Sequence, residues 1–370
     1  TRMIMNSKSA VPEWLSTILV GHSDPKACTR IQPPTTIDFV DTFVDAQHIR
    51  DVFAGKKIDF KPAQGENAIF NKLSITDTSV TVEPYTAKHV SLRNTVRFTP
   101  TQVQAIESAM CHGLTLVVGP PGTGKTDVAV QVASNWLHAY PDQRILIVTH
   151  SNNALNQIFE KIIKLNVDEK YLLRLGHGSE MLETSKDFSK AGRVNHMLQL
   201  RLDLLEEVYR LGYTLGLGQD IAFSCETAES FYKHQIVARW EHFLASVGSD
   251  QSDDAVKNRF PFTDYCLQKW NKTELFDGDD DLEAAKDYMA QINQLFHDLQ
   301  MCRPFEILRG AKGRGNYILT HQARVIAMTC THASLRRKEL VNLKFSFHNI
   351  IMEEAAQVLE IDALIPILLQ

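Results

Sequence analysis

Apolar residues follow two different spacings along the chain, and these spacings predict a mixed α/β fold. Between residues 98 and 178, continuous apolar runs alternate with segments whose apolar residues recur every three or four positions. The runs are typical of buried parallel strands, and the recurring positions are typical of amphipathic helices. The strands are predicted at Leu114–Val118, Ile145–Thr149 and Leu172–Leu175. Repeated strand–helix units predict a parallel sheet with right-handed crossovers.

Two helices in this region have clear signals. Thr99 followed by Pro100 predicts a helix start, because threonine caps helices and proline is favoured at their first position. The segment Ala154 to Lys164 places four apolar side chains on one helix face. They are Leu155, Ile158, Phe159 and Ile162.

Residues 179 to 320 depart from this alternation and predict a helical insertion. Leucine-rich or helical spacing covers Val194–Gly212, Thr227–Val247 and Leu282–Arg303. Polar stretches at Ser249–Asp254 and Asp277–Asp281 lie between the last two. A run of acidic residues binds a metal or is simply solvated, and we favour a solvated loop here. The strand pattern returns at Arg324–Thr331 and Asn349–Met352.

The first 97 residues predict a small β-rich domain. Ile37–Asp41 and Val80–Glu83 alternate at period two, with glycine and proline between them. This part carries no chemical signature. The pattern thus divides the chain into residues 1–97, 98–178, 179–320 and 321–370.

Composition narrows the class of protein. The 370 residues are 44% hydrophobic and 22% charged, which is typical of soluble globular proteins. A net charge of −5 argues against a globally basic nucleic-acid coat but allows a local basic groove. The six cysteines include no C-x-x-C pair, which favours reduced thiols in an intracellular protein and no zinc site. No signal peptide or apolar run of membrane length is present, and the start at Thr1 and the apolar ending suggest a fragment of a longer protein.

The clearest chemical signal is the stretch Gly119 to Thr126, which reads GPPGTGKT. A glycine-rich turn between a predicted strand and a predicted helix is typical of the phosphate loop of nucleotidases. Its backbone N–H groups converge on phosphates, Lys125 reaches the β- and γ-phosphates, and the Thr126 hydroxyl ligates Mg²⁺. The sequence therefore predicts binding of a nucleoside triphosphate such as ATP together with Mg²⁺.

Two acids, Glu353 and Glu354, directly follow a predicted buried strand. A phosphate-loop enzyme needs one acid for the metal and another to activate the attacking water. We assign Glu353 to the metal and Glu354 to the water, in preference to two solvated acids at a strand end.

Other polar residues suit the base of the nucleotide. The amide of Gln102 offers a donor and an acceptor, which match N6 and N7 of adenine, although most glutamines are merely solvated. Arg97 and Phe98 are candidates to flank the base, and Phe98 is equally a candidate core residue.

Small hydroxyl and amide side chains end two predicted strands. Thr149, Ser151 and Asn152 follow one, and Thr329 and Thr331 follow another. Open α/β sheets present ligand-binding loops at these ends, and such side chains suit nucleic-acid phosphates. Each group also reads as a helix cap.

These motifs occur in the order found in superfamily 1 helicases, and the chain resembles the branch that acts on RNA in nonsense-mediated decay and splicing. Segments Val148–Asn152, Leu173–Gly178, Thr329–Ala333 and Met352–Glu360 are similar to its spliceosomal members, as is Pro12–Leu15. The resemblance runs along nearly the whole chain. Glu353 stands where most relatives carry Asp, one methylene shorter.

The resemblance implies a P-loop, RecA-like first ATPase domain that carries a helical insertion. It implies an RNA-stimulated, 3′-to-5′ unwinding ATPase that binds intron RNA and spliceosomal proteins in the nucleus. The catalytic residues it implies are Lys125 and Glu354. The ATP contacts it implies are Arg97, Gln102, Gly119, Pro120, Pro121, Gly122, Thr123, Gly124, Lys125, Thr126, Asp127 and Gln357.

Three expectations complete the sequence-based interpretation. The metal residues are Thr126 and Glu353, and the RNA residues are Thr149, Ser151, Asn152, Thr329 and Thr331. Since the chain stops after the acidic motif, we expect residues 1–370 alone to lack ATPase competence without an arginine from a second domain. Alternatives are another RNA or DNA helicase of the branch, or a spliceosomal scaffold that binds ATP and RNA without turnover.

Overall fold

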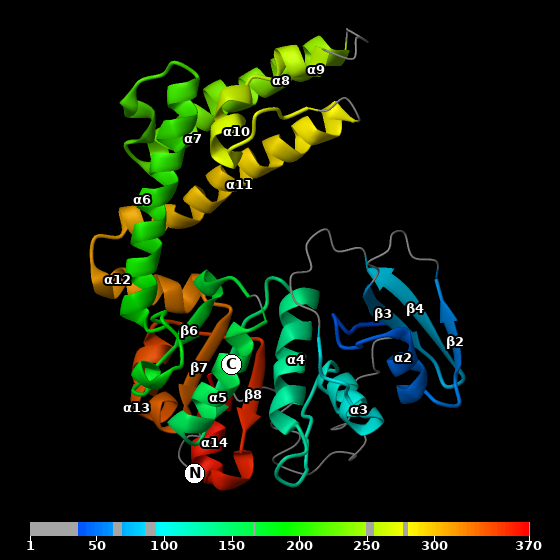
Figure 1. Cartoon of the computed structure of the whole chain (residues 1–370). Coiled ribbons are helices and arrows are strands. Elements are labelled where there is room, and N and C mark those ends of the chain that lie inside the picture. Colours follow the sequence, from blue (N-terminus) through cyan, green and yellow to red (C-terminus); the bar gives the residue numbers. More distant parts are fainter. Residues whose placement is uncertain are drawn as a thin grey trace. The chain divides into compact units, whose positions relative to one another are not determined.

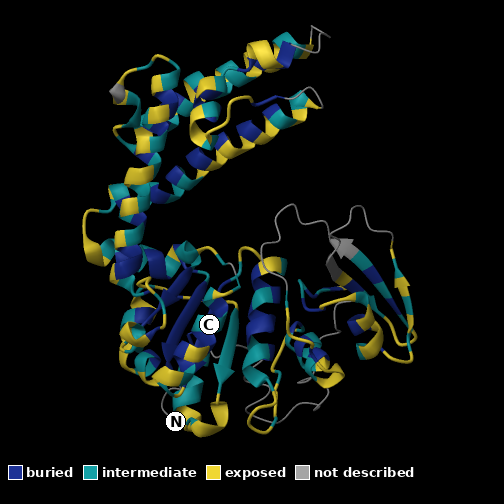
Figure 2. Cartoon of the chain, viewed as in Figure 1, coloured by how far each residue is buried: buried dark blue, intermediate teal, exposed yellow. Residues whose placement is uncertain are grey.

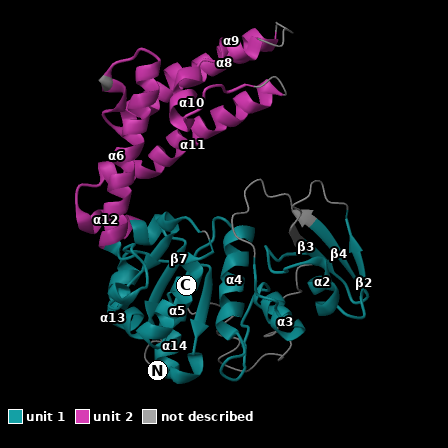
Figure 3. Cartoon of the chain, in the orientation of Figure 1, with its two compact units in different colours: residues 1–190, 318–370 teal, residues 191–317 magenta. Residues whose placement is uncertain are grey.

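The computed structural model describes residues 36–61, 69–85, 94–165, 167–248, 255–276 and 280–369. Figure 1 shows the chain, and Figure 3 shows its two compact units, residues 1–190 with 318–370 and residues 191–317. Three stretches singled out in the sequence lie wholly or mostly outside the described residues. They are Pro12–Leu15, Ser249–Asp254 and the acidic run, of which only Asp280 and Asp281 are described.

A four-stranded parallel sheet organises the first unit. Its spatial order is β6 (Leu172–Arg174), β7 (Val325–Thr329), β5 (Ile145–Thr149) and β8 (Asn349–Glu353). All residues of β5 and β7 are buried, as the dark blue arrows of Figure 2 show, whereas β8 is half-buried. The predicted α/β fold with a parallel sheet is confirmed.

The register of this sheet aligns the ends of its strands. Thr149 at the end of β5 lies opposite Thr329 of β7 on one side and Glu353 of β8 on the other. Side chains that follow these three strands therefore meet at one edge of the sheet.

Helices accompany the sheet within the first unit. They are α3 (Pro100–Ala109), α4 (Lys125–Ala139), α5 (Asn152–Ile163), α13 (Cys330–Asn342) and α14 (Glu360–Ile367). Thr99 caps α3 in a reciprocal capping box with Gln102, which confirms the predicted start. Helix α5 buries the four predicted apolar side chains.

The predicted strand at Leu114–Val118 is wrong. These residues belong to no strand, and Leu116 and Val118 are 77% and 94% exposed. An apolar run becomes a strand only where a neighbour pairs its N–H and C=O groups. Among the described residues, β8 pairs with β5 alone, so the run gains no ladder.

A second four-stranded sheet belongs to the same unit. Its order is β1 (Thr36–Asp38), β3 (Ile69–Ile75), β4 (Ser79–Tyr85) and β2 (Lys57–Phe60), with helix α2 (Ala46–Val52) beside it. Its buried side chains share one apolar core with α3, α4 and the parallel sheet. The His48 ring bonds the Phe98 carbonyl at 2.7 Å, and Gln131 donates to the Val40 carbonyl at 3.0 Å. The domain boundary at residue 97 stays a prediction.

The second unit is helical and has its own aromatic-rich core. Its helices are α6 (Lys190–Thr214), α7 (Cys225–Phe231), α8 (Ala238–Gly248), α9 (Ala255–Arg259), α10 (Thr263–Trp270), α11 (Asp281–Ile307) and α12 (Ala311–Tyr317). The single helix expected over Thr227–Val247 is interrupted by a π-helix, Tyr232–Val237. Its wider turn breaks the 3.6-residue spacing, and there Tyr232 packs on Phe296 with ring centroids 4.7 Å apart.

Short helical segments connect these elements. They are η1 (Glu169–Tyr171), η2 (Ser179–Met181), η3 (Gln219–Ala222), η5 (Ile318–Gln322) and η6 (Ala355–Gln357). Among the helices that the structure describes, none is both long enough and apolar enough to cross a membrane.

Candidate functional site

The phosphate loop turns directly into helix α4. Gly124 is the N-cap of α4, and no side chain caps the helix start there. The first N–H groups of α4 therefore remain available to an anion. Gly124 has φ +74, which favours glycine, and a Cβ on it would lie 2.8 Å from Gln102 Nε2, so that the Gln102 amide would have to shift.

Lys125 lies against the loop that it follows. Its Nζ donates to the carbonyl oxygens of Gly119 at 2.8 Å and Pro120 at 2.9 Å. This holds the ammonium group over the loop, next to the helix start. A phosphate at the helix start would thus meet a positive charge that is already in position.

Thr126 and Glu353 come together across the unit. The Thr126 hydroxyl donates to Glu353 Oε1, which joins α4 to the end of β8. Glu353 Oε2 is buried and has no hydrogen-bond partner among the residues that the structure describes. Burial raises the pKa of Glu353, and the neighbouring Glu354 carboxylate adds repulsion.

The pair passes a physical test for a cation site. A buried carboxylate oxygen without a partner is costly, and a cation beside the carboxylate would offset that cost. One hydroxyl and one carboxylate are oxygen donors of the kind that Mg²⁺ takes alongside water.

Glu354 differs from Glu353 in exposure and backbone. It is exposed and has φ +56, in the left-handed region that non-glycine residues rarely adopt. Gln357, also exposed, ends the short helix η6 and donates its backbone N–H to the Glu354 carbonyl at 2.9 Å. The strained turn directs the chain away from β8 immediately after Glu353.

The residues expected near the base have other partners in this structure. Gln102 accepts from the Thr99 N–H at 2.7 Å and donates to the Thr123 carbonyl at 3.0 Å. Its amide therefore ties α3 to the phosphate loop. Arg97 pairs with Asp45 at 3.2 Å and Asp51 at 2.7 Å.

Two neighbours complete this part of the site. Phe98 is buried in the core, so it is a packing residue rather than one that flanks the base. Asp127, in the first turn of α4, accepts a hydrogen bond from Lys161 of α5 at 2.6 Å.

The five RNA candidates lie at the same sheet edge, but they are not equally accessible. Thr149 is buried, and its hydroxyl donates to the Ser151 carbonyl at 2.7 Å. Ser151 and Thr329 cap α5 and α13 by accepting N–H groups at 3.2 Å. Asn152 and Thr331 are exposed.

The sequence interpretation assigned no role to Arg174, although an arginine inside the apolar run of β6 is a signal. Its guanidinium is buried and donates to the Asn152 and Asn156 side chains at 2.8 and 3.2 Å, and to the Leu175 and His177 carbonyls. Burial lowers its pKa to about 10. Arg174 thus connects the loop after β6 to the loop after β5.

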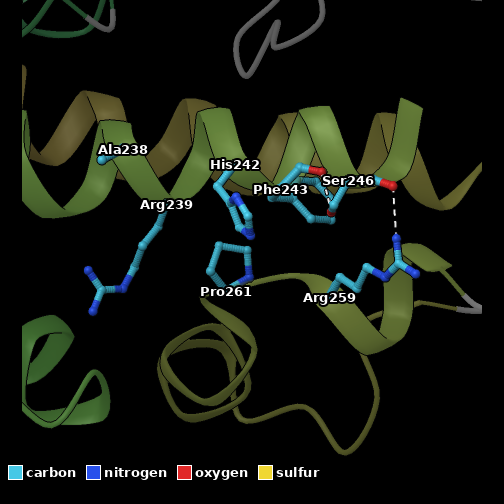
Figure 4. A pocket seen from close by; sticks show the side chains of 7 residues that line it. All are labelled: Ala238, Arg239, His242, Phe243, Ser246, Arg259 and Pro261. Atoms are coloured by element: carbon cyan, nitrogen blue, oxygen red, sulfur yellow. Dashed lines mark hydrogen bonds between the residues drawn. The ribbon is translucent and has the colours of Figure 1, made fainter. Parts of the chain in front are cut away.

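The helical unit has a pocket of its own, of about 560 Å³, shown in Figure 4. Arg239 and His242 of α8 line it together with Pro261. Arg259 donates to the Ser246 carbonyl at 2.8 Å, the dashed line that ends at Arg259 in Figure 4. Among the described residues that line this pocket there is no carboxylate, and we assign the metal and phosphate chemistry to the first unit.

Comparisons with known proteins agree with this geometry. Residues 97–370 match a family model described as AAA domain. The RNA helicase aquarius of Mus musculus is 42% identical over all of this chain, and pre-mRNA-splicing factor cwf11 of Schizosaccharomyces pombe is 23% identical over 96% of it. The chain spans 28% of the length of each.

A further relative matches a smaller part of the chain. DNA polymerase alpha-associated DNA helicase A of Saccharomyces cerevisiae is 39% identical over 24% of this chain and 13% of its own length. Together these relatives confirm the resemblance to superfamily 1 helicases.

Proposed function

The chain belongs to the AAA-domain family, and on that premise we propose that it forms the first RecA-like domain of an ATP-dependent RNA helicase that acts in pre-mRNA splicing. The observation that carries the proposal is the contact between Thr126 and Glu353, which lie 227 positions apart in the chain. It joins the phosphate loop to the strand-end acids, and phosphoryl transfer requires both. The names of the two full-length matches support RNA and splicing as the setting.

In this proposal the domain is assembled from separate parts of the chain. Residues 98–178 and 321–370 form the ATPase domain, residues 179–320 are its helical insertion, and residues 1–97 are an accessory domain. A second RecA-like domain outside this chain supplies an arginine to the transferred phosphoryl group.

ATP binds with its phosphates on the loop and the start of α4. The backbone N–H groups and Lys125 balance the phosphate charge, part of which moves onto the β-phosphate as the bond between the bridging oxygen and the γ-phosphorus breaks. We keep Gln102, Arg97, Asp127 and Gln357 as nucleotide contacts. Arg97 reaches the base only after leaving Asp45 and Asp51.

The Thr126 hydroxyl and the Glu353 carboxylate would hold Mg²⁺, which when bound supplies positive charge to the phosphates. Exposed Glu354 accepts the proton of the attacking water, because its carboxylate is not committed to Thr126. Its left-handed backbone aims the side chain differently from that of Glu353.

RNA crosses the edge where β5 and β7 end. Exposed Asn152 and Thr331 contact its phosphates and sugars. Thr149, Ser151 and Thr329 act indirectly, because their hydrogen bonds fix the shape of the loops and helix starts at this edge. Such contacts position a strand without reading its bases. The full-length protein then works on intron RNA, with spliceosomal proteins, in the nucleus.

The test is Lys125→Ala in the full-length protein, with phosphate release measured with and without single-stranded RNA. We expect turnover to fall roughly 10²- to 10³-fold, the loss typical of removing one preorganised donor to a transition-state charge. Lys338→Ala, which removes an exposed lysine of α13, is the matched control.

Two results would count against the proposal. Equal turnover in Lys125→Ala and the control would show that this loop does not catalyse hydrolysis. RNA binding by the wild-type protein without any turnover would favour the non-hydrolysing scaffold instead.

A further inference from the structure

A second pocket lies in the first unit, at the end of β6. Its volume is about 260 Å³, slightly below the range of about 300–1,000 Å³ for small-molecule sites. We call it the basic pocket. The residues that define it come from β6 and the loop after it, the start of α6, and one face of α13. They are Arg174, Gly176, Lys190, His332, Arg336 and Glu339.

Positive charge dominates this pocket. Among the described residues that line it, three cations face one carboxylate, Glu339, whose oxygens lie 3.7 Å from Lys190 Nζ and 3.4 Å from Arg336 Nη1. Both distances are long for charge-assisted bonds, so much of the donor capacity of the two cations is unused. The Arg336 side chain is 62% exposed and the Lys190 side chain 31%, so a ligand can reach both.

The pocket floor adds a neutral histidine. Burial first, and then the charges of Arg336, Lys190 and Arg174, together lower the pKa of His332 to about 4, while Glu339 acts in the opposite direction. Gly176 has φ +91, and a Cβ there would lie 2.9 Å from His332 Nδ1. Glycine therefore keeps the ring open to the pocket.

The place of the pocket links it to the proposed RNA edge. The sheet order β6-β7-β5 puts the pocket beside the strand that ends at Thr329, with the strand that ends at Thr149 beyond it. Arg174 lines the pocket and also donates to Asn152 at 2.8 Å. One continuous edge therefore runs from the acids after β8 to the basic pocket.

We infer that the basic pocket binds one backbone phosphate of the single-stranded RNA that crosses this edge, an inference that rests on the proposed function. Lys190 and Arg336 would donate to the phosphate oxygens, and a neutral imidazole would add one further donor. The small volume suits a single phosphate rather than a whole nucleotide. The RNA strand thus extends past Thr331 to the end of β6.

The test measures RNA affinity of the full-length protein by fluorescence anisotropy over a series of KCl concentrations. The variants are Arg336→Gln alone and combined with Lys190→Gln, and the matched control is Lys338→Gln on the same helix. We expect the double variant to bind roughly tenfold more weakly. Its slope of log affinity against log salt should fall by about 0.7, as expected for one lost phosphate of a single strand.

Several results would overturn the inference. If both pocket variants bind RNA like the control while Ser151→Ala with Asn152→Ala binds weakly, the pocket takes no RNA and the proposed function stands. If inorganic phosphate binds to the wild-type pocket but RNA affinity is unchanged in the double variant, the pocket serves a free anion. If the wild-type protein binds no RNA, the inference and the proposed function both fail.

The single variant guards against a folding defect. Arg336 is largely exposed, so Arg336→Gln should keep the thermal unfolding midpoint of the control while its salt slope falls. An unchanged slope in this folded variant would by itself contradict a phosphate contact by Arg336.

Discussion

Replacing Arg174 by methionine should destabilise the first unit and weaken RNA binding together. The side chain is 1% exposed, and its guanidinium donates to four acceptors. Methionine fills a similar length of the site but donates nothing. The four acceptors then lose their partner at once.

The magnitude follows from which acceptors water can reach. Asn152 and His177 are exposed and can be hydrated, whereas Leu175 and Asn156 are buried. Two buried acceptors without a donor cost about 1–3 kcal/mol each. Removing a buried charge recovers part of its desolvation cost, so we expect a loss of about 2–4 kcal/mol in the free energy of unfolding.

The assay is thermal and urea unfolding of the full-length variant. For a unit of this size the unfolding midpoint should fall by about 4–16 °C. Arg174→Lys should lie between wild type and methionine, since one ammonium cannot reproduce the planar fork. Arg210→Met, which removes an exposed arginine of α6, should leave the midpoint unchanged.

RNA-binding measurements test separately whether Arg174 positions the Asn152 side chain. If Arg174 acts on RNA through the Asn152 side chain, Asn152→Ala should cost affinity in wild type but little more in Arg174→Met. Fully additive losses would refute this coupling. An unfolding midpoint equal to that of the control would refute the structural argument itself.

Three further predictions concern the site and its surroundings. Glu354→Gln should bind ATP and lose hydrolysis, whereas Glu353→Ala should chiefly weaken the Mg²⁺ dependence of turnover; equal effects of both on nucleotide affinity, measured by titration, would reject the division of roles. Ser151→Ala with Asn152→Ala should lower affinity equally for RNAs of different sequence in a binding assay, and a change of preference at constant mean affinity would speak against backbone contacts. Because the folded pKa of His332, about 4, lies below its ordinary 6.5, the unfolded state binds more protons between these values. Stability should therefore fall as pH drops from about 6.5 to about 4, and His332→Gln should flatten that part of a melting-temperature profile; an unchanged profile would contradict the buried neutral ring.

Local signals in the sequence determined much of this protein. The helix that follows the glycine-rich loop, the capped start of α3 and the apolar face of α5 each depend on residues within one or two turns of each other. Hydrogen bonds of caps and the burial of one helix face act over such short distances, so these features could be predicted correctly.

Other features depended on which segments meet. Leu114–Val118 has the composition of a strand, yet strand formation requires a paired neighbour, which spacing alone does not specify. The π-helix at Tyr232–Val237 departs from 3.6-residue spacing where the ring of Tyr232 packs on Phe296 of α11.

The candidate site shows the same division. The sequence identified Lys125 and Glu353 as candidate functional residues. Only the tertiary structure brought Thr126 to Glu353 and, among the described residues, left one oxygen of that carboxylate buried without a partner. It also gathered Arg174, Lys190 and Arg336, from three distant segments, into the basic pocket. The strength of an electrostatic interaction depends on the distance between the charges and on their burial. Both are fixed only when the chain folds, and here the register of β5, β7 and β8 sets them.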